Sequence, residues 1–280
     1  MAEDPQELEI LPVEIHLPGL LKVLGEHLYS DPRVALRELI QNAHDSCVRR
    51  REEDVAVAGA YVPAIRVRID HSARQIVIDD NGSGLTRDEI NIFLATVGRG
   101  YTRELRERLG GAERDEALEL IGMFGLGLLS AFMIATRVEI TTASYQAPDV
   151  AWQWISEGGQ SYALRSAHRS GWAGTTGRSG ANSVGTTVRL DLRDDARFLL
   201  EPGVLVDALR TYAEFLPIPI TVGDDQELIN GRVAPWLIET EPGPARNAQY
   251  LAWVEERRGM RPLAVLPLDD VTTDTGEVIP

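Results

Sequence analysis

The chain has 280 residues, enough for one large domain and part of a second, and its 44% apolar and 25% charged residues are typical of a globular protein. A formal net charge of −15 makes it a poor general binder of nucleic acid or of an anionic membrane surface. Its single cysteine, Cys47, excludes an intramolecular disulfide and a cysteine-based metal cluster.

We expect no signal peptide at the start of the chain. Residues 1–9 are acidic and lack the apolar core of a signal peptide. No apolar run of about 18 residues occurs in the chain, so we expect no membrane span and a soluble, cytoplasmic protein. Residues 8–17 alternate as an edge strand does, and leucines recur at helical spacing over residues 20–28.

A helix with a polar face is predicted next. Asp31 and Pro32 indicate its start, because aspartate favours the N-cap and proline the first helical position. Glu38, Asn42 and Asp45 follow at i, i+4 and i+7, on one face. Asn42 offers an oxygen that suits Mg²⁺, and Glu38 is placed to take a proton from a water attacking a phosphate. The alternative is a solvated polar stripe on an amphipathic helix.

Residues 76–85 (IVIDDNGSGL) read as a buried strand that runs into a loop, paired as a hairpin with a strand at 65–70. Asp80 would present a carboxylate that accepts a hydrogen bond from an exocyclic amine such as that of adenine. Gly82 and Gly84 allow a ligand to approach the backbone closely. The alternative is an Asx-type turn leading to a helix at 87–95 that Thr86 caps.

Two glycine-rich segments come next. Residues 98–111 hold four glycines and little apolar periodicity, which favours a functional loop or lid over a plain surface excursion. Residues 121–135 (IGMFGLGLLSAFMIA) place three glycines directly before an apolar helix. Backbone N–H groups at such a helix start form an anion nest that fits a triphosphate. The alternative is that these glycines permit close helix packing.

The remaining segments predict mostly strands. We expect strands at residues 137–143, 151–155, 162–165, 185–192 and 217–222, a loop at 171–182 and a helix at 202–215. Thr186 would place a hydroxyl near Asp80. Beyond a polar linker, a helix at 244–258 and a hairpin of 263–268 with 271–279 are too few for an independent core, so we expect the chain to stop inside a second domain.

Three of these motifs, RELIQNAHD, DDNGSGLTRDEI and IGMFGLGLLSAFMIA, resemble in their order the GHKL ATPases, which share the Bergerat fold. They are most similar to those of the heat-shock protein 90 family. The resemblance implies an α/β fold, an α+β two-layer sandwich with a mixed, mostly antiparallel sheet covered by helices. It implies an ATP-binding domain at 1–222 with a lid at about 98–120, a linker at 223–228, and the incomplete start of a middle domain at 229–280.

The resemblance also implies roles for individual residues. Glu38 matches the general base, Asn42 the Mg²⁺ ligand, and Asp80 the carboxylate that reads adenine. The other implied ATP-binding positions are Asp45, Gly82, Gly84, Leu85, Arg99, Gly122, Phe124, Gly125, Leu126, Gly127 and Thr186. The chain departs from the family pattern at Phe93 in place of an asparagine, at Leu85 in place of a methionine, and at Leu128 and Leu129 in place of an aromatic pair.

The implied function is that of a chaperone's ATPase domain, in which ATP, ADP and Mg²⁺ drive a lid and a clamp around client proteins. We expect a homodimer for the full-length protein, a monomer for this chain, and weak hydrolysis, because the resemblance places a needed arginine beyond residue 280. The alternatives are a MutL-type or topoisomerase-type DNA-processing ATPase and a degenerate interaction module. A histidine kinase needs an upstream phospho-acceptor helix pair, and only 36 residues precede Arg37.

Overall fold

The computed structural model describes residues 31–57, 59–94, 127–167, 184–231 and 243–264, together with residues 19, 235, 238, 271–272 and 278–279. These residues belong to two units, Met1–Asn230 and Gly231–Pro280.

The first unit is built on an open sheet of eight strands in the order β5-β4-β3-β6-β2-β1-β7-β8. The strands are β1 (Ile65–Asp70), β2 (Gln75–Asp80), β3 (Ala135–Ala143), β4 (Ala151–Glu157), β5 (Tyr162–Ala167), β6 (Gly185–Leu192), β7 (Ile220–Val222) and β8 (Glu227–Leu228). Only β1 and β7 pair in parallel, and every other neighbouring pair is antiparallel. The predicted mixed, mostly antiparallel sheet is confirmed.

The register of three central strands places the predicted loop. Strands β1 and β2 form the expected hairpin, with Ile65 opposite Asp80 and a turn in which Arg74 has a φ of 56°. Strand β6 pairs on the other side of β2, which sets Thr186 opposite Asp80. Both neighbours of β2 therefore hold the backbone of Asp80 in the middle of the sheet.

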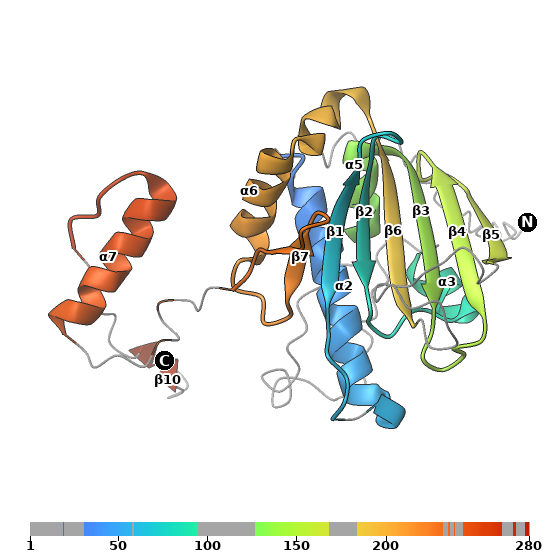
Figure 1. Ribbon diagram of the computed structural model, residues 1–280, viewed down its shortest axis with the longest axis horizontal. Coiled ribbons are helices and arrows are strands. Elements are labelled where there is room, and N and C mark those ends of the chain that lie inside the picture. Colours follow the sequence, from blue (N-terminus) through green and yellow to red (C-terminus); the bar gives the residue numbers. More distant parts are fainter. Residues whose placement is uncertain are drawn as a thin grey trace, which may run out of the picture. The chain divides into compact units, whose positions relative to one another are not determined.

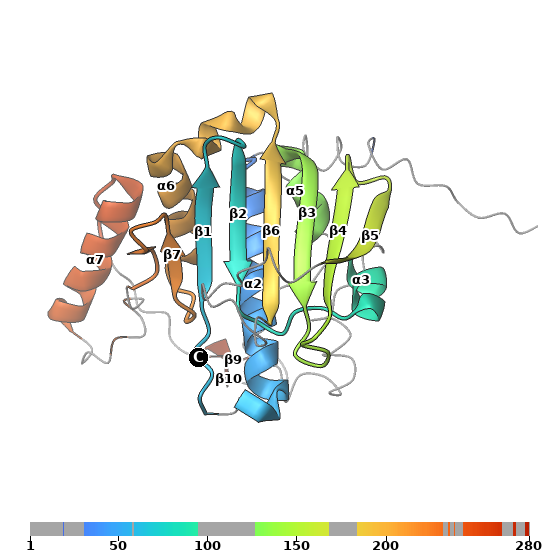
Figure 2. The same cartoon turned by 45° about the vertical axis from the view of Figure 1, so that its right-hand side comes forward.

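The helices of this unit are α2 (Val34–Glu53), α3 (Arg87–Phe93), α5 (Gly127–Ile134) and α6 (Pro202–Ala213), with short 3₁₀ helices η2 (Val55–Val57) and η5 (Asp194–Leu200). Helices α2, α5 and α6 lie on one face of the sheet, behind the strands in Figures 1 and 2. Among the described residues, no helix is both long and apolar enough to cross a membrane.

Two helix starts test the capping predictions. Thr86 forms a capping box with Glu89, as predicted. Helix α2 is assigned from Val34 rather than from Pro32, but the Asp31 carboxylate still accepts the Arg33 backbone N–H at 2.9 Å. The difference lies within the usual uncertainty of helix ends.

The core lies between the sheet and these helices. Alternate strand residues point into it, including Ile65 and Val67 of β1, Ile76 and Ile78 of β2, and Leu190 of β6. They pack against the apolar face of α2, which buries Leu36, Leu39, Ile40, Ala43 and Cys47. Since residues two apart in a strand share a face, Asp80 points to this helix-covered side after Ile76 and Ile78.

The first unit continues through the segment that we expected to be a linker, residues 223–228. Strand β8 pairs with β7, with Leu228 opposite Thr221. Two residues later, the Asn230 side chain donates to the carbonyl oxygens of Leu216 and Ile218 and accepts the Ile220 N–H. These bonds tie the segment to the sheet, and the first compact unit extends to Asn230.

The second unit contains helix α7 (Pro244–Arg258), which confirms the predicted helix at 244–258. Proline occupies its first turn, and Gly259, with a φ of 64°, ends it. Strands β9 (Val271–Thr272) and β10 (Val278–Ile279) form an antiparallel hairpin. This pairing lies inside the segment 271–279 that we expected to pair with 263–268, and residues 265–270 lie outside the described residues.

Candidate functional site

Helix α2 carries the predicted polar face over Glu38, Asn42 and Asp45. The Asn42 side chain is exposed, whereas Asp45 is buried and its Oδ1 lies 3.3 Å from His44 Nδ1. The Glu38 carboxylate is paired with the guanidinium of its neighbour Arg37 at 2.5 Å. Arg37 Nε and Nη2 both donate to Glu38 Oε1, so these contacts do not use the second carboxylate oxygen, Oε2.

The start of helix α5 lies directly against this face. A Cβ added at Gly127, the first residue of α5, would come within 2.9 Å of Asn42 Nδ2, so this side chain lies close to the start of α5. The first backbone N–H groups of a helix have no partners within it, and they favour an anion together with the helix dipole. The structure thus brings together Asn42, the predicted Mg²⁺ ligand, and Gly127, the last residue of the predicted anion nest.

Asp80 ends β2 as a buried carboxylate. Its Oδ1 accepts hydrogen bonds from the Ser46 hydroxyl on α2, at 3.1 Å, and from the Gly82 backbone N–H, at 2.9 Å. Burial raises the pKa of Asp80 to about 7, against the lowering effect of the bonds from Gly82, Ser46 and Thr186. The carboxyl group is therefore ready to change its protonation state, or to be stabilised by a ligand, near neutral pH.

The bond from Gly82 to Asp80 is also the Asx-type turn that we considered as the alternative for this loop. The turn and a ligand site are compatible, because the turn uses only one of the two carboxylate oxygens. The turn alone leaves the burial of Asp80 unexplained, since exposed aspartates serve equally well in such turns.

Glycines hold this loop between α2 and β3. A Cβ at Gly82 would lie 2.2 Å from Ser46 Oγ, and a Cβ at Gly84, whose φ is 60°, would lie 1.9 Å from the Ala143 carbonyl oxygen. Gly185 has a φ of 135°, and a Cβ added there would lie 2.1 Å from the Asp80 carbonyl oxygen. These glycines are required by neighbouring backbone as well as by any ligand.

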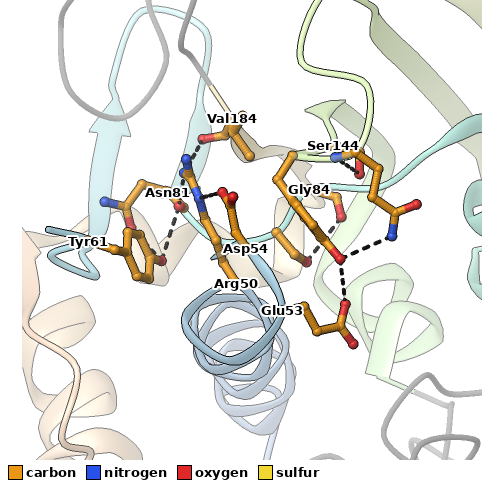
Figure 3. Close-up of polar contacts among 12 residues, drawn as sticks. Arg50, Glu53, Asp54, Tyr61, Asn81, Gly84, Ser144 and Val184 are labelled. Atoms are coloured by element: carbon orange, nitrogen blue, oxygen red, sulfur yellow. Dashed lines mark hydrogen bonds and ion pairs between the residues drawn. The ribbon is translucent and has the colours of Figure 1, made fainter. Parts of the chain in front are cut away.

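Polar contacts from the second half of α2 fix the backbone just after Asp80, as Figure 3 shows. Arg50 donates to the Asn81 carbonyl oxygen at 2.7 Å and forms an ion pair with Asp54 at 3.2 Å. The Tyr61 hydroxyl donates to the same Asn81 oxygen at 3.1 Å. Because Asn81 is held from these directions, the Asp80 carboxylate has little freedom to move.

Thr186 lies on the same side of the sheet as Asp80. Its hydroxyl is 3.0 Å from that of Thr142 on β3, and Thr142 Oγ1 also accepts the Leu85 backbone N–H at 2.9 Å. The structure thus joins Leu85, Thr142 and Thr186 in one short chain of hydrogen bonds next to Asp80.

Sequence reasoning missed three residues of this site, Ser46, Thr142 and Gly185. Ser46 follows Asn42 by four residues, so helical periodicity places it on the same face, and this signal was available. No local pattern marks Thr142 or Gly185, because their roles depend on strand pairing.

Some predicted site residues lie outside the described residues. They are Arg99, Gly122, Phe124, Gly125 and Leu126, together with the lid predicted at residues 98–120.

We compared the sequence with known protein families and with known proteins. Residues 29–161 match the family described as "Histidine kinase-, DNA gyrase B-, and HSP90-like ATPase". A protein named "Chaperone protein HtpG" from Methylobacterium sp. (strain 4-46) is 37% identical over 215 residues, which is 76% of this chain and 33% of that protein.

Proteins with the same name come from other bacteria. The one from Gluconobacter oxydans (strain 621H) is 35% identical over 74% of this chain and 32% of its own length. The one from Rhizobium meliloti (strain 1021) is 32% identical over 79% of this chain and 34% of its own length. The chain thus spans about a third of the length of the curated relatives that it matches.

Proposed function

Because the chain belongs to the histidine kinase-, DNA gyrase B- and HSP90-like ATPase family, we propose that its first unit binds ATP with Mg²⁺ and hydrolyses it slowly. We further propose that this ATPase serves an HSP90-like chaperone, since similar proteins carry the name chaperone. Client proteins, pairing into a homodimer and a monomeric state of this chain are parts of the same proposal.

One observation carries the proposal of nucleotide binding. A single face of α2 meets a buried carboxylate through Ser46, which contacts Asp80, and a glycine-initiated helix through Asn42, which contacts Gly127. The two contacts are one helical turn apart on α2, about 6 Å along its axis. A ligand with an amine at one end and phosphates at the other matches this order of groups.

In this proposal Asp80, Asn42 and Glu38 have separate roles in nucleotide binding and hydrolysis. Asp80 accepts a hydrogen bond from the exocyclic amine of adenine. The Asn42 side-chain oxygen is a ligand type that Mg²⁺ prefers, and bound Mg²⁺ neutralises phosphate charge. Glu38 is the base that takes a proton from the attacking water, while Arg37 holds its Oε1 atom.

A DNA-processing ATPase of the MutL or topoisomerase type is the second candidate from within the same family. The net charge of −15 disfavours it, because binding to DNA phosphates draws on lysine and arginine. The chaperone name of the relatives disfavours it as well.

The test is isothermal titration with ADP and with ATP·Mg²⁺, combined with steady-state ATPase measurements on wild type and on Glu38→Ala. We expect Glu38→Ala to abolish turnover while nucleotide affinity stays within about twofold, because the base acts on water rather than on the nucleotide. The control is Glu52→Ala, which removes an exposed carboxylate in the last turn of the same helix and should leave both quantities unchanged.

Two outcomes would contradict the proposal. Unchanged turnover in Glu38→Ala would remove Glu38 from the mechanism. Absence of any nucleotide binding by wild type would favour the interaction module that keeps the fold without the ligand.

A further inference from the structure

The contact between Ser46 and Asp80 is the feature of the site that the proposed catalytic roles leave unexplained. Ser46 Oγ donates to Asp80 Oδ1 at 3.1 Å, and the Ser46 carbonyl oxygen accepts the Ser83 N–H at 2.9 Å. The residue therefore touches the loop twice, once through its backbone and once through its hydroxyl. Only the hydroxyl acts on the carboxylate.

Two of the donors to this carboxylate, Ser46 and Gly82, meet the same atom, and the Thr186 backbone N–H also favours the ionised form. Oδ1 accepts from Ser46 and from Gly82, and two hydrogen bonds fill the acceptor capacity of one carboxylate oxygen. A ligand must consequently be met by Oδ2. When Asp80 is ionised, Oδ2 only accepts; when it is protonated, the proton resides on Oδ2, which then donates.

These two states suit two chemical classes of purine. A 6-amino purine such as adenine presents a donor at the position where a 6-oxo purine such as hypoxanthine presents an acceptor. The ionised form of Asp80 therefore matches the 6-amino group, and the protonated form matches the 6-oxo group.

We propose that Ser46 is a positioning residue that makes Asp80 select 6-amino over 6-oxo purine nucleotides, by holding the carboxylate in its ionised form with Oδ2 toward the ligand. The inference rests on the proposed nucleotide binding and deepens it. Ser46 acts through Asp80. The hydroxyl stabilises the ionised form because a hydrogen bond to a charged acceptor is stronger than one to a neutral carboxyl group.

The surroundings make this hydroxyl matter at neutral pH. Burial brings the pKa of Asp80 to about 7, and the neighbouring Asp79 raises it as well. The other titratable or charged groups that the structure describes around it are Cys47 and Arg50 on α2 and Tyr61 after that helix. Burial raises the pKa of Cys47 to about 12 and that of Tyr61 further above its ordinary value, so both are neutral here.

From the sheet, β6 faces Asp80 with the Thr186 backbone N–H and β1 with the apolar Ile65. The Ser46 hydroxyl is therefore one of the described donors that favour the ionised form of Asp80 against the effect of burial.

The experiment compares ADP with inosine diphosphate by isothermal titration from pH 6 to 8.5, on wild type, Ser46→Ala, Ser46→Thr and Ser83→Ala. We expect Ser46→Ala to weaken ADP binding about threefold at pH 7.5 and to tighten binding of inosine diphosphate about threefold, because a pKa raised by about one unit exchanges the ionised and protonated fractions of Asp80. The midpoint of the pH dependence of ADP binding should move up by about one pH unit. Ser46→Thr, which keeps the hydroxyl, should restore preference and midpoint.

Ser83→Ala is the matched control, because the buried Ser83 hydroxyl lies in the same loop but donates to the Gly84 carbonyl oxygen. It should leave preference and midpoint unchanged. An equal loss of both nucleotides in Ser46→Ala, with no shift of midpoint, would show a merely structural role and overturn the inference. The same shift in Ser83→Ala would overturn it too. If wild type binds neither nucleotide, the proposed function fails together with the inference; if wild type binds ADP and Ser46→Ala behaves like wild type, only the inference fails.

Discussion

Asp79 and Asp80 end the same strand, but they point to opposite faces of the sheet. Both are buried, with 4% and 5% of their surface exposed. Asp79 accepts the Thr187 hydroxyl at 2.6 Å and pairs with the guanidinium of Arg68 at 2.6 Å. The contacts described for the Asp80 carboxylate come instead from a hydroxyl and from backbone N–H groups. Burial alone therefore does not distinguish the two carboxylates. Asp79 is neutralised by the Arg68 guanidinium, whereas the described contacts of Asp80 include no such ion pair.

The same contrast extends over the two faces. The helix-covered face is apolar apart from the site, whereas the other face carries cross-strand polar contacts. They include Arg137 with Asp191 at 3.3 Å, Arg189 with Glu139 at 3.6 Å, and Gln153 with Glu139 at 2.7 Å. Such pairs stabilise a sheet by modest amounts each. We infer that the face on which no described helix packs serves the stability of the sheet, and that the face with α2, α5 and α6 carries the candidate site.

The largest effect is expected where the loop of the site is pressed against the sheet. Gly84→Ala would place a Cβ 1.9 Å from the Ala143 carbonyl oxygen at a φ of 60°, so the backbone must move. We expect the free energy of unfolding to fall by more than about 4 kcal/mol, measured by urea denaturation.

Gly158→Ala provides the control, because Gly158 has a φ of 65° and open space around its added Cβ. It should cost only the backbone strain, about 1–2 kcal/mol. An equal decrease in the free energy of unfolding in the two variants would show that close packing against Ala143 does not stabilise the loop.

The second effect is a pH dependence of stability that Asp80 carries. Its folded-state pKa of about 7 lies above its ordinary value of 3.8, so the folded protein binds the proton more tightly than the unfolded chain does. This contribution to stability is fully present below about pH 4 and is lost as the pH rises through 7. Between pH 5 and pH 8 wild type should lose about 2–3 kcal/mol on this account.

Asp80→Asn, which cannot titrate, should lack this loss when both proteins are unfolded with urea at several pH values. A wild-type curve that runs parallel to that of Asp80→Asn would contradict the raised pKa.

Local signals in the sequence predicted the elements that local chemistry determines. The capping box of Thr86 and Glu89 and the limits of α7 between Pro244 and Gly259 follow from residues a few positions apart. The recognition of an HSP90-like ATPase from three motifs is confirmed by the family match and by the similar proteins.

Contacts between distant residues were harder to predict. Ser46 and Asp80 are 34 positions apart, and the role of the serine exists only once β2 lies against α2. The end of the first unit was expected at residue 222, because Asn230 gives no local hint that its side chain bonds the backbone 10 to 14 residues earlier. The sequence alone therefore allowed us to predict the motifs, but not the long-range contacts that connect them.

The most direct test of the contrast between the two carboxylates is the affinity for ATP·Mg²⁺ of Asp79→Asn and Asp80→Asn, measured by isothermal titration at pH 7.5 on protein shown to be folded. Asp80→Asn should weaken binding by one to two orders of magnitude, about 1.4–2.8 kcal/mol, because the buried group no longer accepts the adenine amine as a carboxylate. Asp79→Asn should bind within about twofold of wild type, since its carboxylate serves Thr187 and Arg68 on the other face. Equal affinities in the two variants, or a larger loss in Asp79→Asn, would contradict the assignment of Asp80 as the group that reads the base.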